Sequence, residues 1–246
     1  MSNYYNTCVS LFYLGGNFFG SQSQPNLPTV ESEIIKSLKL YFSNFKDFTL
    51  ASRTDKGVSG FQYFGLKIAD NNIHEIHRKF DEIRLNLSED IHIKKVYFMP
   101  DSFNVRKDAL IRTYIYKITD KKLIDSVNIE NMRLASNYLV GKNNFMSFSG
   151  RNAKNKFIRE IYKIKIIIID KILFFEISGK SFIHQQIRRI IYSLIRIGLG
   201  KETKEWLEIL INFPSKGGSK GIVSSNNLTL KEVLYHKNHQ KILEKV

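Results

Sequence analysis

Residues 52–60 read SRTDKGVSG and form a polar loop between two strand-like segments. The loop places the carboxylate of Asp55 between the cations Arg53 and Lys56. Gly57 can adopt a positive φ, so the backbone can turn tightly there or approach a ligand closely. Asp55 is therefore expected to be exposed at the tip of a rigid loop. An aspartate there can act as a nucleophile or a base, but it can equally cap a turn or a helix. The loop alone leaves both interpretations open.

The segments around this loop predict a first half of mixed α and β structure. Thr29 is suited to cap a helix, because apolar residues then recur every three or four positions at Val30, Ile34, Leu38 and Tyr41. The same spacing predicts a second helix that begins near Asn72, with Ile76, Phe80, Ile83 and Leu87 on its apolar face. Strands are expected over residues 9–14, 48–50, 60–68 and 91–98.

The second half is richer in strand patterns. Residues 111–118 alternate between apolar and polar side chains, which predicts a half-exposed strand. Residues 162–169 and 172–177 are dense in β-branched side chains and flank Asp170-Lys171, which predicts a hairpin. From residue 182 to residue 199 the apolar spacing becomes that of a helix.

Pro100 and Asp101 mark the boundary expected between the two halves. Residues 1–105 are expected to form an N-terminal α/β half that carries the Asp55 loop, and residues 106–246 a C-terminal α/β half. Because nothing near Pro100 resembles a long flexible linker, we expect the halves to share one continuous sheet.

The composition excludes several classes of protein. The hydrophobic fraction of 43% and the charged fraction of 25% are typical of a globular chain. The longest apolar run, residues 166–177, is interrupted by charges and is shorter than the about 20 residues that cross a membrane. The single cysteine, Cys8, cannot form an internal disulfide, and no Cys/His cluster has the spacing of a metal site. The first residues show no signal-peptide pattern, so a cytoplasmic location is expected.

The net charge of +15 favours a polyanionic partner, and nucleic acid is the natural candidate. Clustered Lys and Arg bind phosphates by releasing condensed counterions. A chain rich in Lys can also carry most of its charge on solvated faces, so the charge does not decide the function by itself.

Several segments resemble, in order, the motifs of the tRNA pseudouridine synthase A family. Residues 52–59 resemble its signature loop. The other matching segments are FFGSQ at 18–22, FNVR at 103–106, RTYIY at 112–116, NFMSF at 144–148 and FIHQQIRR at 182–189. The resemblance extends from about residue 9 to residue 235, and the ordered set is far more specific than any one motif.

The resemblance implies an α+β pseudouridine synthase fold, in which two related α/β halves share a central, mostly antiparallel mixed sheet with a basic cleft between them. It implies that the protein isomerises uridine to pseudouridine in tRNA, with the anticodon stem-loop, positions 38 to 40, as the expected target. Bacterial members of the family are often homodimers, so a homodimer is also expected. No cofactor and no metal are required.

The resemblance also assigns roles to single residues. Asp55 is expected to be the catalytic aspartate, Tyr114 the aromatic residue that packs against the target uracil, and Arg188 the basic residue that pairs with the aspartate. From the residues alone, Tyr114 could be a cross-strand packing partner and Arg188 a solvated charge on a helix. The candidates for contacts with the substrate are Arg53, Arg112, Lys56 and the basic loop over residues 151–159.

Pseudouridine formation cuts the N-glycosidic bond, rotates the uracil and joins its C5 to the ribose. A carboxylate can attack the sugar or the base covalently, or remove a sugar proton to give an elimination intermediate, and the sequence does not choose between these routes. Two other functions are alternatives: a tRNA-binding or chaperone-like protein of the same fold without turnover, and a phosphoryl-transfer hydrolase. No Asp/Glu cluster for Mg²⁺ accompanies Asp55, which disfavours the hydrolase.

The chain departs from the common bacterial pattern of the family at four positions. Ser52 stands in place of glycine, Lys56 of alanine and Ser59 of histidine within the signature loop, and Ser21 in place of an earlier tryptophan. These substitutions leave the residues assigned to the chemistry intact. They resemble archaeal and eukaryotic branches of the family, and the branch determines which uridines are modified.

Overall fold

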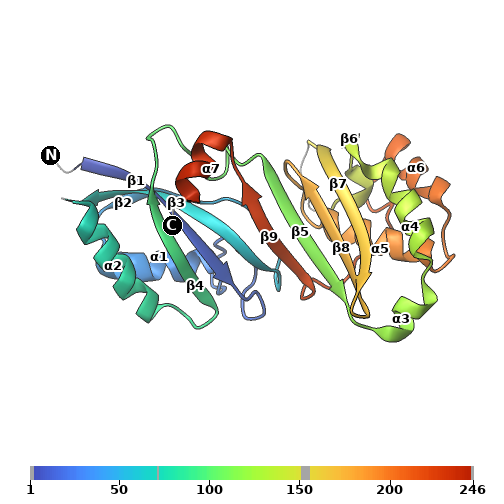
Figure 1. The fold of residues 1–246 in the computed structure, drawn as a ribbon, viewed down its shortest axis with the longest axis horizontal. Helices are drawn as coiled ribbons and strands as arrows, with labels where there is room; N and C mark the ends of the chain where they lie inside the picture. The colour runs from blue at the N-terminus through green and yellow to red at the C-terminus, as the bar shows by residue number, and fades with distance from the viewer. Residues whose placement is uncertain (1–2, 71, 151–155, 245–246) are drawn as a thin grey trace. The chain divides into compact units, whose positions relative to one another are not determined.

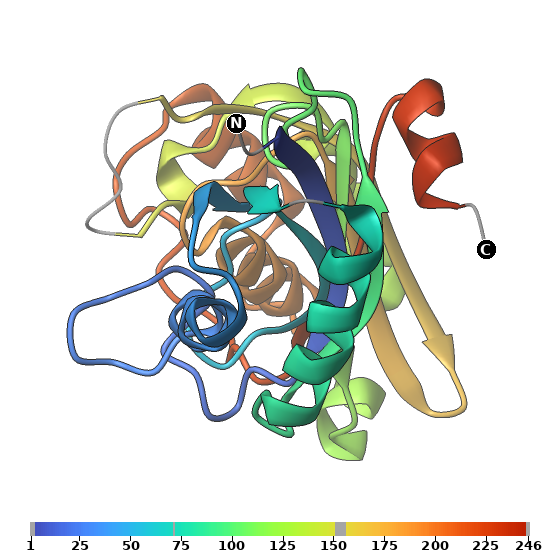
Figure 2. The ribbon, with the colours of Figure 1, turned by 90° about the vertical axis from the view of Figure 1, so that its left-hand side faces the viewer.

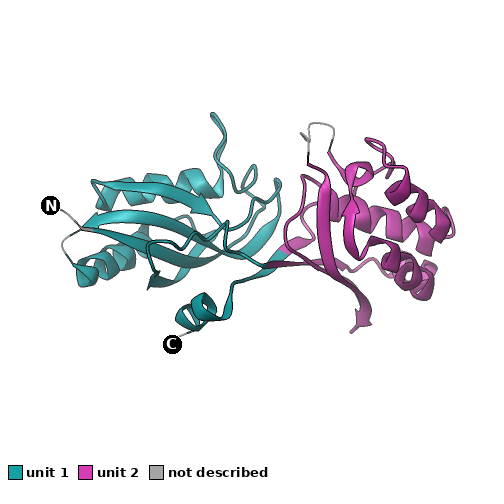
Figure 3. Ribbon diagram, turned by 90° about the horizontal axis from the view of Figure 1, so that it is seen from above, with its two compact units in different colours: residues 1–110, 230–246 teal, residues 111–229 magenta. Residues whose placement is uncertain are grey.

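The computed structural model describes residues 3–70, 72–150 and 156–244, which divide into two compact units (Figures 1 and 3). Unit 1 comprises residues 1–110 and 230–246, and unit 2 comprises residues 111–229. Strands of a central, mostly antiparallel sheet and several helices make up the fold. The α+β class expected from the sequence is confirmed.

Unit 1 is built on strands that are hydrogen-bonded in the order β4-β1-β3-β9, with β2 also paired to β3. The central strand β1 pairs antiparallel with β3 on one side and β4 on the other. The chain returns to unit 1 within β9. The elements are β1 (Asn3–Tyr13), α1 (Val30–Tyr41), β2 (Phe45–Leu50), β3 (Ser59–Asp70), α2 (Ile73–Asn86), β4 (Ile91–Phe98), β9 (Leu228–Leu234) and α7 (Lys237–Leu243).

Two helices cover one face of this sheet, and a third covers the other (Figure 2). Thr29 caps α1 by accepting a hydrogen bond from the amide of Ser32, as the sequence predicts. Apolar side chains of α1 and α2 join those of β1, β3 and β4 in one buried cluster. On the opposite face, Tyr63 of β3 meets Tyr235, just before α7, edge to face at 5.5 Å between ring centroids.

Unit 2 contains strands in the order β5-β8-β7-β6. Its helices α4, α5 and α6 pack together, and α4 also lies against β7. The elements are β5 (Ile111–Ile118), α3 (Lys121–Ser126), α4 (Ile129–Ser136), β6 (Gly141–Asn144), β7 (Ile158–Ile169), β8 (Ile172–Gly179), α5 (Gln186–Gly198) and α6 (Lys204–Asn212), with 3-10 turns at Asn137–Leu139 and Met146–Phe148.

The predicted hairpin is confirmed in β7 and β8. Ile169 pairs with Ile172, so the connection has two residues, Asp170 and Lys171. Both have positive φ, 51° and 62°, as expected for the turn type whose twist matches that of the flanking strands.

Two predictions for unit 2 are wrong in detail. The strand β5 is not half exposed: Thr113 is only 3% exposed and shares a hydrogen bond of 3.0 Å with Ser178 across the strand pair. The helix predicted from residue 182 begins at Gln186 instead, because Gln185 has a φ of +67° and this left-handed conformation cannot continue a right-handed helix.

Within the described ranges, no helix is long and apolar enough to cross a membrane. No group of three or more His, Cys, Asp or Glu residues in the same part of the chain could hold a metal ion.

Candidate active site

The Asp55 loop joins β2 to β3 in unit 1. The amide of Val58 donates to the carbonyl of Asp55 at 3.2 Å, and Gly57 has a φ of +81°, so residues 55–58 form a tight turn. Asp55 is half buried, whereas Arg53 and Lys56 are exposed. The positive φ that the sequence allows at Gly57 is confirmed. The expectation that Asp55 is exposed is wrong, because its side chain is half buried.

Thr54, the residue before Asp55, is held through both its backbone and its side chain. Its amide donates to the hydroxyl of Ser21 at 2.8 Å, and its carbonyl accepts from the amide of Ser21 at 3.1 Å. Its hydroxyl shares a hydrogen bond of 2.7 Å with the hydroxyl of Tyr13.

Gln62 supports the same loop from β3. Its side-chain amide donates to the Tyr13 hydroxyl at 3.1 Å, and its side-chain carbonyl oxygen accepts from the amide of Ser52 at 3.1 Å. Tyr13, Ser21 and Gln62 are each at most 2% exposed. The two bonds of Gln62 are therefore buried, and the bonds from Tyr13 and Ser21 to Thr54 are partly buried.

Backbone packing supports the loop from the other side. The segment between β1 and α1 lies so close to it that a Cβ on Gly15 would be 2.3 Å from the carbonyl oxygen of Val58. Gly20 has a φ of +103°, and a Cβ there would be 2.9 Å from the carbonyl oxygen of Thr54. Both positions therefore require glycine. The amide of Gly15 also donates to the hydroxyl of Ser59 at 3.1 Å.

The two cations of the loop have different surroundings. The ammonium of Lys56 lies 3.8 Å from the centroid of the Phe19 ring, which is a cation–π contact. Arg53 lines a pocket of unit 1 together with Gln22 and Arg106.

Tyr114 lies on β5 in unit 2, on the same face as Arg112 and Tyr116, as the strand alternation predicts. Its side chain is 5% exposed, and its ring meets that of Phe182 edge to face at 5.6 Å between centroids. The planes of the two rings are at 89°, so Phe182 packs against Tyr114 from the segment just before α5. The described contacts of this ring are compatible with a packing role as well as with a role in catalysis.

The two arginines assigned in unit 2 are each oriented by a backbone carbonyl. Arg112 is 7% exposed and donates from Nη1 to the carbonyl of Lys180 at 2.6 Å. Arg188, in the first turns of α5, is half buried and donates from Nε to the carbonyl of Val223 at 3.0 Å. Burial raises the pKa of Tyr116, and the positive charge of Arg188 opposes that shift.

Arg53, Asp55 and Lys56 are thus together in one loop of unit 1, and Arg112, Tyr114 and Arg188 belong to unit 2. Part of the basic loop proposed over residues 151–159, namely 151–155, lies outside the described residues. Sequence reasoning missed the buried supports of the loop, Tyr13 and Gln62, because they lie on two strands and only the strand register brings them together.

Gly15→Ala should lower the free energy of unfolding by on the order of 1–3 kcal/mol, because the new methyl group forces the backbone of the Asp55 loop to move. The neighbouring Gly16→Ala is the matched control: its methyl group meets nothing within 4 Å, so the change should be neutral or stabilising by up to about 1 kcal/mol. Urea unfolding followed by circular dichroism measures both. Equal effects of the two substitutions would show that the close approach at Gly15 does not constrain the loop.

Comparison with known proteins identifies the family. A family model described as tRNA pseudouridine synthase matches residues 135–236. The tRNA pseudouridine synthase A of Thermosipho melanesiensis is 34% identical over 241 residues, which covers 92% of this chain and 98% of that protein. The protein of the same name from Fervidobacterium nodosum is 33% identical over 242 residues, with the same coverage. That of Methanosarcina barkeri is 31% identical over 208 residues, 83% of this chain and 75% of that protein.

Among solved structures, an archaeal box H/ACA sRNP Nop10-Cbf5 complex aligns with 13% identity and a TM-score of 0.35, covering 77% of this chain and 42% of that chain. That similarity is too weak to inform the fold or the function. The sequence relatives are decisive: because identity exceeds 30% over about nine-tenths of the chain, this protein belongs to the tRNA pseudouridine synthase A family and is an isomerase that acts on tRNA.

Proposed function

We propose that Asp55 is the carboxylate that carries out the isomerisation of uridine in tRNA. The observation that supports this proposal most directly is the placement of Asp55 beside Thr54, which partly buried hydrogen bonds hold on both backbone and side chain. A reacting group must be held within a fraction of an ångström of its productive position, and a half-buried turn with such an anchor can do this.

The reaction is an isomerisation, and its bond changes occur within the uridine itself. The bond between C1′ of the ribose and N1 of uracil breaks, the base rotates, and C5 bonds to C1′; the C5 proton is lost and N1 gains a proton. Asp55 can take part by bonding covalently to the sugar or the base, or by removing a sugar proton. In either route the carboxylate must be ionised when it reacts.

Tyr114 and Arg188 complete the proposal. Tyr114 would hold the detached uracil by stacking, with its ring plane set by the edge contact with Phe182. Arg188 would favour the ionised form of Asp55 and direct it, because a guanidinium forms strong, oriented hydrogen bonds with a carboxylate. The bond from Arg188 to the carbonyl of Val223 already restricts its side chain, which reduces the entropy lost when it engages.

Arg53, Arg112 and Lys56 are proposed to contact the tRNA. Lys56 is exposed and braced by the Phe19 ring, which suits a residue that meets a phosphate. We further propose, from the family resemblance, that the targets are positions 38 to 40 of the anticodon stem-loop, that the enzyme is a homodimer and that it works in the cytoplasm.

Incubation of the purified protein with unmodified tRNA, followed by carbodiimide-dependent primer extension, tests activity and position together. The wild-type protein should produce stops at positions 38 to 40. Asp55→Asn, nearly isosteric but uncharged, should reduce turnover by at least about a thousandfold and leave the affinity for tRNA within about a factor of ten, since phosphate contacts elsewhere dominate binding.

Asp101→Asn makes the same chemical change at an exposed position of unit 1 and is the matched control; it should keep wild-type activity. Substantial turnover by Asp55→Asn would exclude Asp55 as the catalytic carboxylate. Stops at other positions would retain the enzyme but refute the anticodon assignment.

Two substitutions at Tyr114 separate stacking from packing. Tyr114→Phe keeps the ring and should retain tRNA binding and most of the capture of the base, whereas Tyr114→Ala removes stacking worth roughly 1–3 kcal/mol and should lower the turnover rate correspondingly. Single-turnover kinetics and melting curves are measured on the same preparations.

The competing role is plain core packing, since the Tyr114 side chain is 5% exposed. If packing is its only role, Tyr114→Ala will lower the melting temperature while the folded fraction reacts at the wild-type rate. That result would remove Tyr114 from the proposed site.

A further inference from the structure

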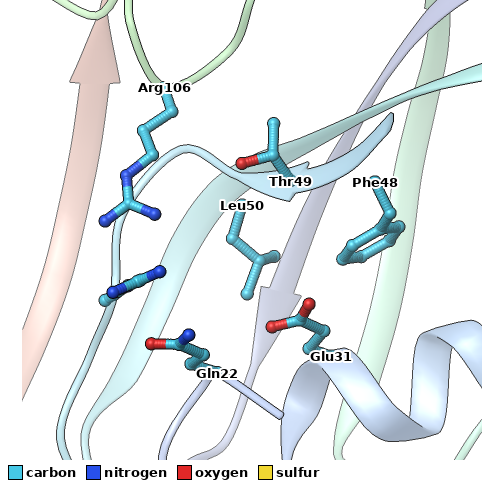
Figure 4. Close-up of a pocket in the computed structure, with 7 residues that line it drawn as sticks. Gln22, Glu31, Phe48, Thr49, Leu50 and Arg106 are labelled. Atoms are coloured by element: carbon cyan, nitrogen blue, oxygen red, sulfur yellow. The ribbon is translucent and has the colours of Figure 1, made fainter. Parts of the chain in front are cut away.

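A polar pocket in unit 1 lies beside the Asp55 loop (Figure 4). Four segments form its wall: Gln22 before α1, Glu31 in the first turn of α1, residues 48–50 of β2 with Arg53 just after them, and Arg106. Arg106 reaches in from the connection between β4 and β5, and Gln22 and Glu31 approach from the other side. The resemblance assigns no role to Gln22, Glu31 or Arg106.

The backbone that carries Arg106 is a rigid turn. The side-chain oxygen of Asn104 accepts hydrogen bonds from the amides of Arg106 and Lys107, each at 3.0 Å. The amide of Asn104 in turn donates to the carboxylate of Asp108 at 2.8 Å. A turn of this kind fixes the start of the Arg106 side chain and leaves less entropy to be lost when a ligand binds.

The charges around the pocket favour a ligand with one negative charge. Among the residues that line the pocket, two guanidinium groups and one carboxylate, that of Glu31, leave a net charge of +1. Glu31 is held in place because one carboxylate oxygen accepts from the amide of Ser23 at 2.9 Å. A phosphodiester carries one negative charge, and guanidinium groups match its oxygens in geometry. A terminal phosphate, with close to two charges, fits this balance less well.

The pocket is also close to the reacting group. Arg53 is two residues from Asp55, so their Cα atoms are at most about 7.6 Å apart. Gln22 follows Ser21, whose hydroxyl and amide hold Thr54. A ligand bound in the pocket would therefore contact residues next to Ser21 and Thr54, the hydrogen-bonded pair that positions Asp55.

We propose that this pocket binds a single phosphodiester of the tRNA backbone near the target nucleotide, with Arg106 and Arg53 as donors to its oxygens. The proposal rests on the proposed function, because it gives the tRNA a fixed register relative to Asp55. Phosphate contacts set position and carry no base information, so the pocket aligns the strand whichever tRNA is bound.

Filter-binding titrations of unmodified tRNA at several salt concentrations test the proposal. Arg106→Gln should weaken binding about five- to tenfold at low salt and reduce the slope of log K against log salt by about one, because one phosphate contact is lost. Glu31→Gln removes the negative charge and should tighten binding by about two- to threefold. Arg78→Gln, an equal loss of charge on the exposed face of α2, is the matched control and should stay within about twofold of wild type.

Ethylation of single tRNA phosphates locates the contact. Ethylation at one position should interfere with binding to the wild-type protein but not with binding to Arg106→Gln. Equal losses of tRNA affinity in Arg106→Gln and Arg78→Gln would show a general effect of net charge and would overturn the proposal. The proposal would also be overturned if Arg106→Gln kept the ethylation-interference pattern of the wild-type protein. If Arg106→Gln melts well below wild type, Arg53→Gln replaces it in both measurements, with the same outcomes.

Binding requires no turnover, so this proposal and the proposed function fail in different ways. A wild-type protein that forms no pseudouridine would refute the function. A wild-type protein that forms pseudouridine while Arg106→Gln keeps the wild-type affinity and interference pattern would refute the pocket alone.

Discussion

The hydrogen bond between the hydroxyls of Tyr13 and Thr54 ties the Asp55 loop to the core of unit 1. Tyr13 is fully buried at the end of the central strand β1. Its hydrogen bond therefore attaches the loop to a residue that the packing of the sheet holds in place. Such a bond adds only about 1 kcal/mol net. The Tyr13 hydroxyl also accepts a hydrogen bond from the side-chain amide of Gln62, so the support is a connected set of bonds. The same support serves the pocket beside the loop, because Ser21 holds Thr54 and is followed by Gln22.

The departures from the common family pattern have a structural explanation at three positions. Ser21 exchanges two hydrogen bonds with the backbone of Thr54, and Ser59 accepts one from the amide of Gly15. Lys56 gains a cation–π contact with Phe19. The loop is therefore held by small hydroxyl side chains where the common pattern has larger rings, and its backbone conformation does not depend on those rings.

Local signals in the sequence predicted much of the fold. The cap at Thr29, the strands over residues 91–98 and 111–118, and the two-residue turn at Asp170-Lys171 depend on neighbouring residues, so sequence patterns reveal them. The start of α5 depends on the left-handed backbone of Gln185, which no pattern marks, because glutamine rarely adopts it. Likewise, no sequence signal marks the return of residues 230–246 to unit 1.

In the candidate site, too, local sequence patterns reveal some residues and only the folded chain reveals the others. A contiguous motif pointed to Asp55, but its supports come from strands whose register sets Tyr13 near Gln62 across 49 positions of sequence. The pocket around Arg106 likewise gathers residues from four segments, and only the folded chain brings them together.

The most direct test of this account is the single-turnover rate of pseudouridine formation for Thr54→Val and Thr54→Ser. Valine keeps the shape of the side chain but removes the hydroxyl that meets Tyr13, so the rate should fall about ten- to a hundredfold through misplacement of Asp55, with the affinity for tRNA unchanged. Serine keeps the hydroxyl and should react at close to the wild-type rate. A wild-type rate for Thr54→Val would contradict the claim that this hydrogen bond positions the reacting carboxylate.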